Sequence, residues 1–170
     1  MLYAITVTQY RKMLDNLSSF LDKAAQFAET KKIDVDVLLN SRLAADQFNF
    51  IRQVQIACDT AKFGAARLTG KEAPSHPDTE KTLEELKARI KKVQEYLDTF
   101  STEDFDGAED RHVSQPRWEG KYISGLEFAF QHSIPNLYFH ITTAYSILRH
   151  NGVDVGKKDF LGQIPYKQPN

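Results

Sequence analysis

Apolar residues recur at intervals of three and four along the first hundred positions of the chain, a spacing that predicts amphipathic helices. The first repeat covers residues 10–28 and is followed by a break over residues 31–36. The second covers residues 43–68, is rich in small side chains and ends at Gly70, and the third covers residues 83–100. The apolar positions of these three predicted helices are Tyr10, Leu14, Leu17, Leu21, Ala24 and Ala28, then Leu43, Phe50, Ile51, Val54, Cys58, Ala61, Ala65 and Leu68, then Leu83, Leu86, Ile90, Val93, Leu97 and Phe100.

A fourth helix is predicted between Pro135 and Gly152, because proline suits the first helical position and glycine the position just past the end. His140 lies at the edge of its apolar face, and Asn136 lies one turn earlier on the same side. Residues 153–170 hold two glycines and two prolines and are expected to wrap over the helices as an extended tail. The apolar face consists of Leu137, Ile141, Ala144 and Leu148.

The connection over residues 101–134 is the hardest part of the chain to interpret. Turn signals at residues 104–107 and 115–116 are compatible with a small hairpin. Ser124 and Glu127 fit a capping box, which favours a short helix, although the residues that follow also alternate as in a strand. Elsewhere, residues 72–78 are expected to form a loop, and a second capping box, Thr82 with Glu85, fits the start of the third helix.

Four long amphipathic segments without convincing strand pairs predict an all-α fold. We expect residues 1–170 to form a single domain, an up-down four-helix bundle. The prediction includes a long connection between the third and fourth long helices and the extended C-terminal tail. With 170 residues, of which 41% are hydrophobic, the chain is long enough to bury a sizeable core.

Composition excludes several classes of function. With 22 basic and 23 acidic residues the net charge is -1, so no nucleic-acid partner is expected. No apolar stretch approaches the roughly 20 residues that span a bilayer, so no membrane partner is expected. The single cysteine, Cys58, cannot form an internal disulfide, and the N-terminus lacks the pattern of a secretory leader, which favours a cytoplasmic location.

Helical bundles build binding sites from polar side chains that point inward from facing helices. With 100° per residue, Asp46 and Gln53 fall along one flank of the apolar stripe of the second predicted helix, and Gln47 falls on the stripe. His140 and Asn136 are their counterparts on the fourth helix. The other histidines, His76, His112, His132 and His150, fall in loops or at helix ends and are expected at the surface.

The order and spacing of several short motifs resemble the DinB/YfiT-like superfamily, whose members are assigned as metalloenzymes. Within it, the chain resembles a bacterial family defined as a domain of unknown function. The resemblance covers most of the chain. Its motifs are Ala44-Ala-Asp46, Arg52-Gln-Val-Gln-Ile-Ala-Cys-Asp59, Ala66-Arg-Leu-Thr-Gly70, Pro135-Asn-Leu-Tyr-Phe-His140, Ala144-Tyr-Ser-Ile-Leu-Arg-His-Asn-Gly-Val153 and Gly156-Lys-Lys-Asp-Phe-Leu-Gly162.

The resemblance implies a divalent metal such as Zn, Ni or Fe, bound by one histidine of the second helix and a His-x-x-x-His pair of the fourth. His140 matches the second histidine of that pair, and Asn136 stands at the first position. Residues 43–68 contain no histidine, so two of the three implied ligands are replaced. Amide oxygens bind such metals poorly, which makes His140 the one candidate ligand.

Two interpretations of the polar residues follow. In the first, Asp46, Gln53, Asn136 and His140 form an altered site of a small-molecule enzyme related to the thiol-cofactor-dependent transferases and isomerases of the superfamily, with Tyr145 in the pocket wall. In the second, His140 forms a buried polar cluster with Gln53 and Asn136 that fixes the register of the helices. The protein is then a non-catalytic module that binds a small molecule or another protein.

The first helix has an apolar surface wider than a single stripe, through Tyr10, Met13, Phe20 and Phe27. This width, the resemblance to proteins that commonly dimerise and the frequency of two-fold symmetry predict a homodimer paired through long helices. The competing interpretation is that the tail covers this surface. Its apolar residues are Phe160, Leu161 and Ile164.

Overall fold

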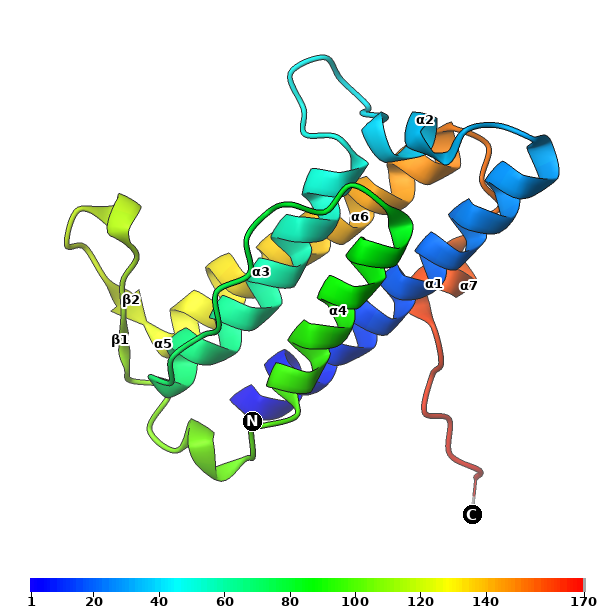
Figure 1. Cartoon of the computed structure of the whole chain (residues 1–170). Helices are drawn as coiled ribbons and strands as arrows, with labels where there is room; N and C mark the ends of the chain where they lie inside the picture. Colours follow the sequence, from blue (N-terminus) through cyan, green and yellow to red (C-terminus); the bar gives the residue numbers. More distant parts are fainter. Residues whose placement is uncertain (170) are drawn as a thin grey trace.

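Four long helices lie side by side in the computed structural model, which describes residues 1–169 (Figure 1). They are α1 (Gln9–Lys31), α3 (Phe50–Thr69), α4 (Leu83–Leu97) and α6 (Ile134–His150). Helix α1 contacts the other three, and α3 also contacts α4 and α6. The predominantly helical architecture confirms the predicted fold class. Within residues 1–169, no helix combines the length and the apolar character that crossing a membrane requires.

Short elements connect the long helices. A small antiparallel hairpin pairs two strands of two residues each, Val113 with Ile123 and His112 with Ser124, in the connection where a hairpin was compatible with the sequence. The short elements are the π-helical turns Ala4–Thr8 (η1) and Phe128–Ser133 (η4), the 3-10 turns Glu103–Phe105 and Pro116–Trp118, the helices α2 (Val35–Asn40), α5 (Gly125–Glu127) and α7 (Lys157–Leu161), and the strands β1 (His112–Val113) and β2 (Ile123–Ser124).

The second long helix begins later than its apolar repeat predicts. The side chain of Asn49 accepts a hydrogen bond from the Arg52 backbone N–H at 3.1 Å and caps α3 at Phe50. Residues 41–49 form a loop in which Leu43 is exposed, so the predicted start at Leu43 is wrong. The predicted end is confirmed, because Gly70 adopts a φ of 76° at the C-cap.

The loop between α3 and α4, residues 70–82, runs back along α3 (Figure 1). Near its beginning, the Glu72 carbonyl accepts a hydrogen bond of 2.8 Å from the hydroxyl of Tyr96, close to the end of α4. Near its end, Glu80 contacts Arg89 in the middle of α4. Helices α3 and α4 therefore point in the same direction. The helices do not alternate in direction throughout, as a simple up-down order would require.

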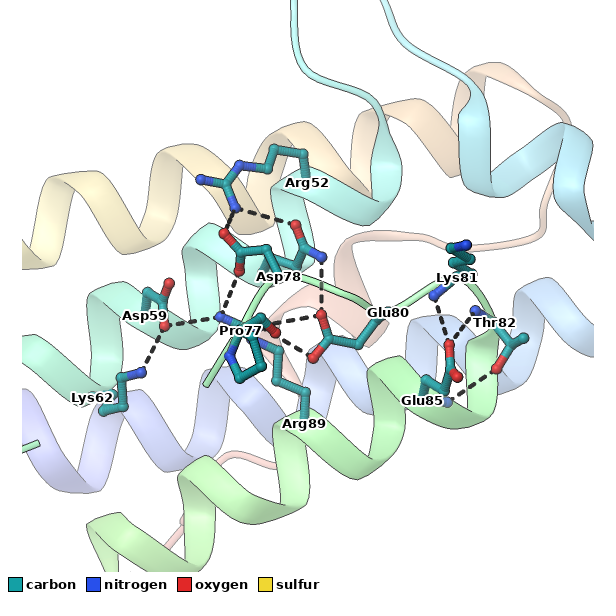
Figure 2. Close-up of polar contacts among 11 residues, drawn as sticks. Arg52, Asp59, Lys62, Pro77, Asp78, Glu80, Lys81, Thr82, Glu85 and Arg89 are labelled. Atoms are coloured by element: carbon teal, nitrogen blue, oxygen red, sulfur yellow. Dashed lines mark hydrogen bonds and ion pairs between the residues drawn. The ribbon is translucent and has the colours of Figure 1, made fainter. Parts of the chain in front are cut away.

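Arg89, on α4, attaches residues 70–82, the crossing loop, to the helices (Figure 2). Its guanidinium is buried, with Nη2 2.9 Å from Asp59 on α3 and 3.0 Å from Asp78 in the loop. Nη1 lies 3.1 Å from both carboxylate oxygens of Glu80. A buried guanidinium is tolerated only when its charge is compensated in this way, so the position of the loop depends on these contacts.

Two further cations complete the cluster around Arg89. The buried ammonium of Lys62 lies 2.9 Å from Asp59, and Arg52 forms an ion pair with Asp78 (Figure 2). Three positive and three negative side chains thus meet here, so the cluster carries no formal net charge. The predicted capping box of Thr82 and Glu85 is present just beyond it and starts α4.

The last long helix belongs to a continuous helical run from Gly125 to His150. The predicted capping box of Ser124 and Glu127 starts this run, which confirms the short helix favoured by the sequence. The α-helix α6 begins at Ile134, which confirms the predicted start at Pro135 to within one residue, but the helical run itself begins earlier, at Gly125. Proline lacks an N–H and crowds the preceding turn, and the π-helical turn η4 lies immediately before it, where a wider turn accommodates the ring.

The wide apolar surface of α1 is covered within the chain. The tail forms helix α7, where an entirely extended segment was predicted, and α7 packs on α1. The ring of Phe160 stacks on Phe20 with centroids 6.5 Å apart, and the Phe160 carbonyl accepts a hydrogen bond of 2.8 Å from Asn16. Tyr10, Met13 and Phe20 are buried. The surface from which the homodimer was predicted is therefore not free. The tail covers part of it through Phe160, whereas Leu161 and Ile164 are exposed.

Helix α3 closely approaches the η4–α6 run, and also α1, at Gly64. A Cβ atom at this position would lie 2.5 Å from Ser133 Oγ and 2.9 Å from the ring of Tyr10. The Tyr10 hydroxyl donates a hydrogen bond of 2.7 Å to the same Ser133 oxygen. Only glycine leaves room for this contact, so the small side chains of α3 set its distance from these neighbours.

We expect Gly64→Ala to destabilise the protein by about 1–3 kcal/mol, because overpacking outweighs the ~1 kcal/mol by which alanine favours a helix over glycine. Urea unfolding at neutral pH measures the difference. Gly156→Ala is the matched control, because the nearest atom to its added Cβ is the flexible Asp159 carboxylate at 3.9 Å. A Gly64 variant as stable as the control variant would contradict the close approach.

Candidate functional site

His140 and Gln53 meet in the contact between α3 and α6, as the sequence predicted. The Nδ1 atom of His140 lies 2.7 Å from Gln53 Oε1, and both side chains are buried. Gln53 Nε2 donates a hydrogen bond of 3.0 Å to the carbonyl of Phe48, in the loop before α3. A short hydrogen-bonded chain therefore joins α6, α3 and the loop that precedes α3.

These hydrogen bonds determine which nitrogen of His140 carries the proton. The amide nitrogen of Gln53 faces a carbonyl, so its oxygen faces the imidazole and accepts a hydrogen bond from Nδ1–H. Burial, with a smaller effect from the positive charge of Arg52, lowers the pKa of His140 to about 4. The imidazole is therefore neutral at physiological pH. Its Nε2 atom has no hydrogen-bond partner within the described residues 1–169.

Asn136 lies one turn before His140 but makes a different contact. Its Nδ2 donates a hydrogen bond of 2.7 Å to Thr60 Oγ1 on α3. Thr60 in turn donates to the carbonyl of Ile56 at 2.7 Å. The two polar positions of α6 thus bind α3 at sites about two turns apart, and Asn136 does not complete a cluster around His140.

Two of the predicted site residues lie elsewhere. Asp46 is exposed in the loop before α3, because that helix starts at Phe50, and Gln47 lies in the same loop. The helical wheel that placed Asp46 on a flank of the apolar stripe and Gln47 on the stripe therefore does not apply to them. Tyr145 packs against Phe20 of α1 and Phe160 of α7, with ring centroids 6.0 and 5.9 Å away.

The donors around His140 do not fit a divalent metal. The oxygen of Gln53 already accepts from the imidazole, and the nitrogen of the Asn136 amide faces Thr60. Neutral amides bind Zn, Ni and Fe poorly, and the nearby positive charge of Arg52 disfavours a cation. Among residues 1–169, no three or more His, Cys, Asp and Glu side chains gather as a metal site would require.

Cys58 is also unsuited to chemistry. It is fully buried in α3, and burial raises the pKa of its thiol to about 12, although the nearby charge of Arg89 opposes the shift. A thiol in this state supplies almost no thiolate at neutral pH. The prediction from sequence that Cys58 is packed in the core is confirmed.

A cavity of about 340 Å³ lies on the α3–α6 contact next to Asn136 and Thr60. Its wall includes Arg67 from α3 and two residues of the 115–133 segment, Arg117 and His132. Sequence reasoning assigned His132 to the surface and did not consider the two arginines. His132 is partly buried, stacked on the ring of Phe128 with centroids 5.3 Å apart. No periodic pattern marks these residues, since folding of the hairpin segment onto α3 brings them together.

No curated protein matches the chain. Among solved structures, a crystal structure of a DinB family member protein from Shewanella denitrificans is similar, with 67% sequence identity and a TM-score of 0.97. The match covers 99% of this chain and 96% of that one. The family model described as domain of unknown function DUF1993 matches residues 2–161. The chain therefore belongs to the DUF1993 family and is a DinB-like protein.

Proposed function

We propose that this protein binds a small molecule in the cavity between α3 and the 115–136 segment, without a metal centre of the DinB type. The observation that carries the proposal is the hydrogen bond of 2.7 Å between His140 and Gln53. It engages the Gln53 oxygen on α3, and the Asn136 amide is engaged with Thr60, so His140 Nε2 is left as a single nitrogen without the two further ligands that a metal site of this type needs. The cavity, in contrast, contains side chains that can bind a ligand directly, among them Asn136 and Thr60.

The role of His140 in this proposal is structural. Its Nδ1–H and the Gln53 amide satisfy one another in a buried contact, and such pairs favour a single register of two helices. A metal-free enzyme that uses the remaining Nε2 atom is the alternative. An imidazole whose pKa is about 4 is a weak base, however, and general bases work best with a pKa near the operating pH. The low pKa of His140 therefore favours its structural role over a catalytic one.

Assembly is the second part of the proposal. We keep the predicted homodimer, paired through a long helix, but place its contact on the α5–α6 run instead of on α1. Large apolar side chains are exposed along this run, namely Leu126, Phe130 and Phe139. Leu126 and Phe130 lie four residues apart and therefore on one side of the run, and apolar side chains that gather on one side of a surface are typical of protein contacts. A reducing cytoplasm is the proposed compartment, because the one cysteine is a buried free thiol.

The first prediction tests ligand binding without metal. In protein treated with EDTA, we expect small-molecule fragments to shift the backbone amide resonances of cavity residues such as Thr60 and Asn136 in ¹H–¹⁵N spectra. Adding Zn²⁺ back should leave their affinities unchanged, because no ligand set for the ion is present. Fragment binding that appears only after Zn²⁺ is restored would contradict the proposal, as would binding that maps to a different region.

The second prediction concerns pH. The folded protein holds His140 neutral down to pH ~4, whereas the unfolded chain binds this proton near pH 6.5. Stability is therefore lost as the pH falls from about 6.5 to 4, by about 2–3 kcal/mol from this residue. We expect His140→Gln to remove that part of the loss in urea unfolding between pH 7 and 4.

The exposed His150, at the end of α6, provides the matched control. His150→Gln should lose stability with falling pH just as the wild-type protein does. Carboxylates that titrate in the same range affect all three proteins equally and cancel in the comparison. Equal pH dependence in the wild-type protein and His140→Gln would show that the imidazole is not held neutral.

The third prediction concerns the dimer. Light scattering across a dilution series should give a dimeric mass, and Phe130→Ser should shift the population to monomer because it removes an exposed ring from the proposed contact. Tyr166→Ser is the control, since this ring is 87% exposed in the tail. A monomeric mass of the wild-type protein at high micromolar concentration would end the proposal.

A further inference from the structure

We propose that the ligand of this cavity is a small organic anion, and that Arg67 and Arg117 hold its carboxylate or phosphate group. The inference rests on the proposed function and names the class of ligand. It follows from the charges, the hydrogen-bonding groups and the aromatic rings that the fold brings together in the cavity wall.

The two arginines lack the carboxylate partners that the arginines of the cluster around Arg89 have. Arg52 and Arg89 both form ion pairs with carboxylates. Arg67 and Arg117 line the cavity, and neither forms an ion pair with a carboxylate of residues 1–169. Planar guanidinium groups bind carboxylates and phosphates through paired hydrogen bonds. A ligand anion would supply the missing negative charge.

The two positive charges also act on one another. Burial, and to a smaller extent the charge of Arg117, lower the pKa of Arg67. The Arg67 guanidinium lies over the ring of Phe63, 5.0 Å from its centroid, which holds it at the cavity wall. A half-buried positive charge, Arg67, thus shares the cavity wall with an exposed one, Arg117. A bound anion would relieve this repulsion, and the positive charges that would bind it are already in place in the protein without a ligand.

The one carboxylate in the wall, Asp59, does not offset these arginines. It belongs to the neutral cluster of the crossing loop, where its Oδ1 atom lies 2.9 Å from both Lys62 and Arg89. Its charge is therefore already compensated by two buried cations. The side of the cavity formed by Arg67 and Arg117 remains positive.

His132 adds hydrogen-bonding capacity without adding charge. Its Nε2 lies 2.8 Å from Arg117 Nη2 and 3.3 Å from Gln115 Nε2, so this nitrogen accepts and the proton is on Nδ1. Burial and the two arginines lower the pKa of His132, which keeps the ring neutral. The Nδ1 atom is buried and has no partner in the described chain. Buried donors without partners are uncommon and often mark a site.

The ligand is expected to carry an apolar body. Phe63 and Phe128 both line the cavity, and His132 lies almost parallel to Phe128 at an interplanar angle of 16°. The π-helical turn η4, a form often found at functional sites, supplies Phe128 and His132. An aromatic or similarly flat anion satisfies both the arginines and these rings.

Four probes test the inference by calorimetry and by ¹H–¹⁵N spectra of the full chain: benzoate, phenyl phosphate, inorganic phosphate and the neutral benzamide. We expect benzoate or phenyl phosphate to bind in the cavity at least roughly tenfold more tightly than benzamide, because charge-assisted hydrogen bonds are stronger than neutral ones. Whichever of the two binds more tightly distinguishes a carboxylate ligand from a phosphate ligand. Binding of inorganic phosphate alone would overturn the apolar part of the inference.

Substitutions locate the binding. Arg67→Gln and Arg117→Gln should each weaken binding of the preferred anion roughly tenfold and leave benzamide unaffected. Arg149→Gln is the matched control, because this arginine is exposed at the end of α6 and pairs with Asp154. Arg117 is exposed, so its variant keeps the test valid if Arg67→Gln fails to fold.

The outcomes separate this inference from the proposed function. Benzamide that binds in the cavity as tightly as benzoate overturns the anion and leaves the small-molecule proposal in place. Anion binding that survives both arginine substitutions overturns the assignment of Arg67 and Arg117. If none of the four probes binds in the millimolar range, the anion inference fails, and the fragment experiment decides the proposed function separately.

Discussion

The close packing of α3 against α6 is the contact on which both the fold and the candidate site depend. Gly64 lets the two helices approach until Ser133 nearly touches the α3 backbone. Two polar pairs follow along the same contact, Thr60 with Asn136 and then Gln53 with His140. Side chains as short as Thr and Asn meet at 2.7 Å only because the helix axes are close. A bulkier residue in place of Gly64 would separate these pairs.

The same contact leaves the residues around His140 unsuited to the metal site that the superfamily resemblance implies. A histidine that binds a metal commonly donates its second N–H to an oxygen, and His140 makes this kind of hydrogen bond to Gln53. One imidazole nitrogen does not make a metal site, however. The other ligand positions hold an amide engaged with Thr60 and a loop in which Asp46 points to solvent. His140 keeps the orientation of a metal-binding histidine, but its hydrogen bond to Gln53 joins α6 to α3.

Charge is distributed in two contrasting ways on either side of α3. Around Arg89, three cations and three carboxylates neutralise one another and hold the crossing loop. In the wall of the cavity, Arg67 and Arg117 both lie without a carboxylate partner of their own. Buried ion clusters contribute little net stability when complete, but a missing partner is costly. The first arrangement is therefore explained by the fold, whereas the second is explained better by a ligand.

The sequence by itself determined the helices that have strong local signals. Periodic apolar residues identified the four long segments, and side-chain caps or glycine fixed the starts at Ser124 and Thr82 and the end at Gly70. These features depend on neighbours within one turn. The same local reasoning placed the start of α3 at Leu43, because Leu43 and Phe50 have the seven-residue spacing of a helix. It did not recognise Asn49, between them, as the residue that caps the start of α3.

Within the candidate site, the pairing of His140 with Gln53 was accessible from the sequence because each residue lies beside an apolar stripe on facing helices. Only the tertiary structure decided the rest. The direction of the crossing loop, the covering of α1 by Phe160 and the meeting of Arg67 with Arg117 join residues far apart in the chain. Such contacts depend on how whole elements pack, and periodicity within one element carries no information about its partner.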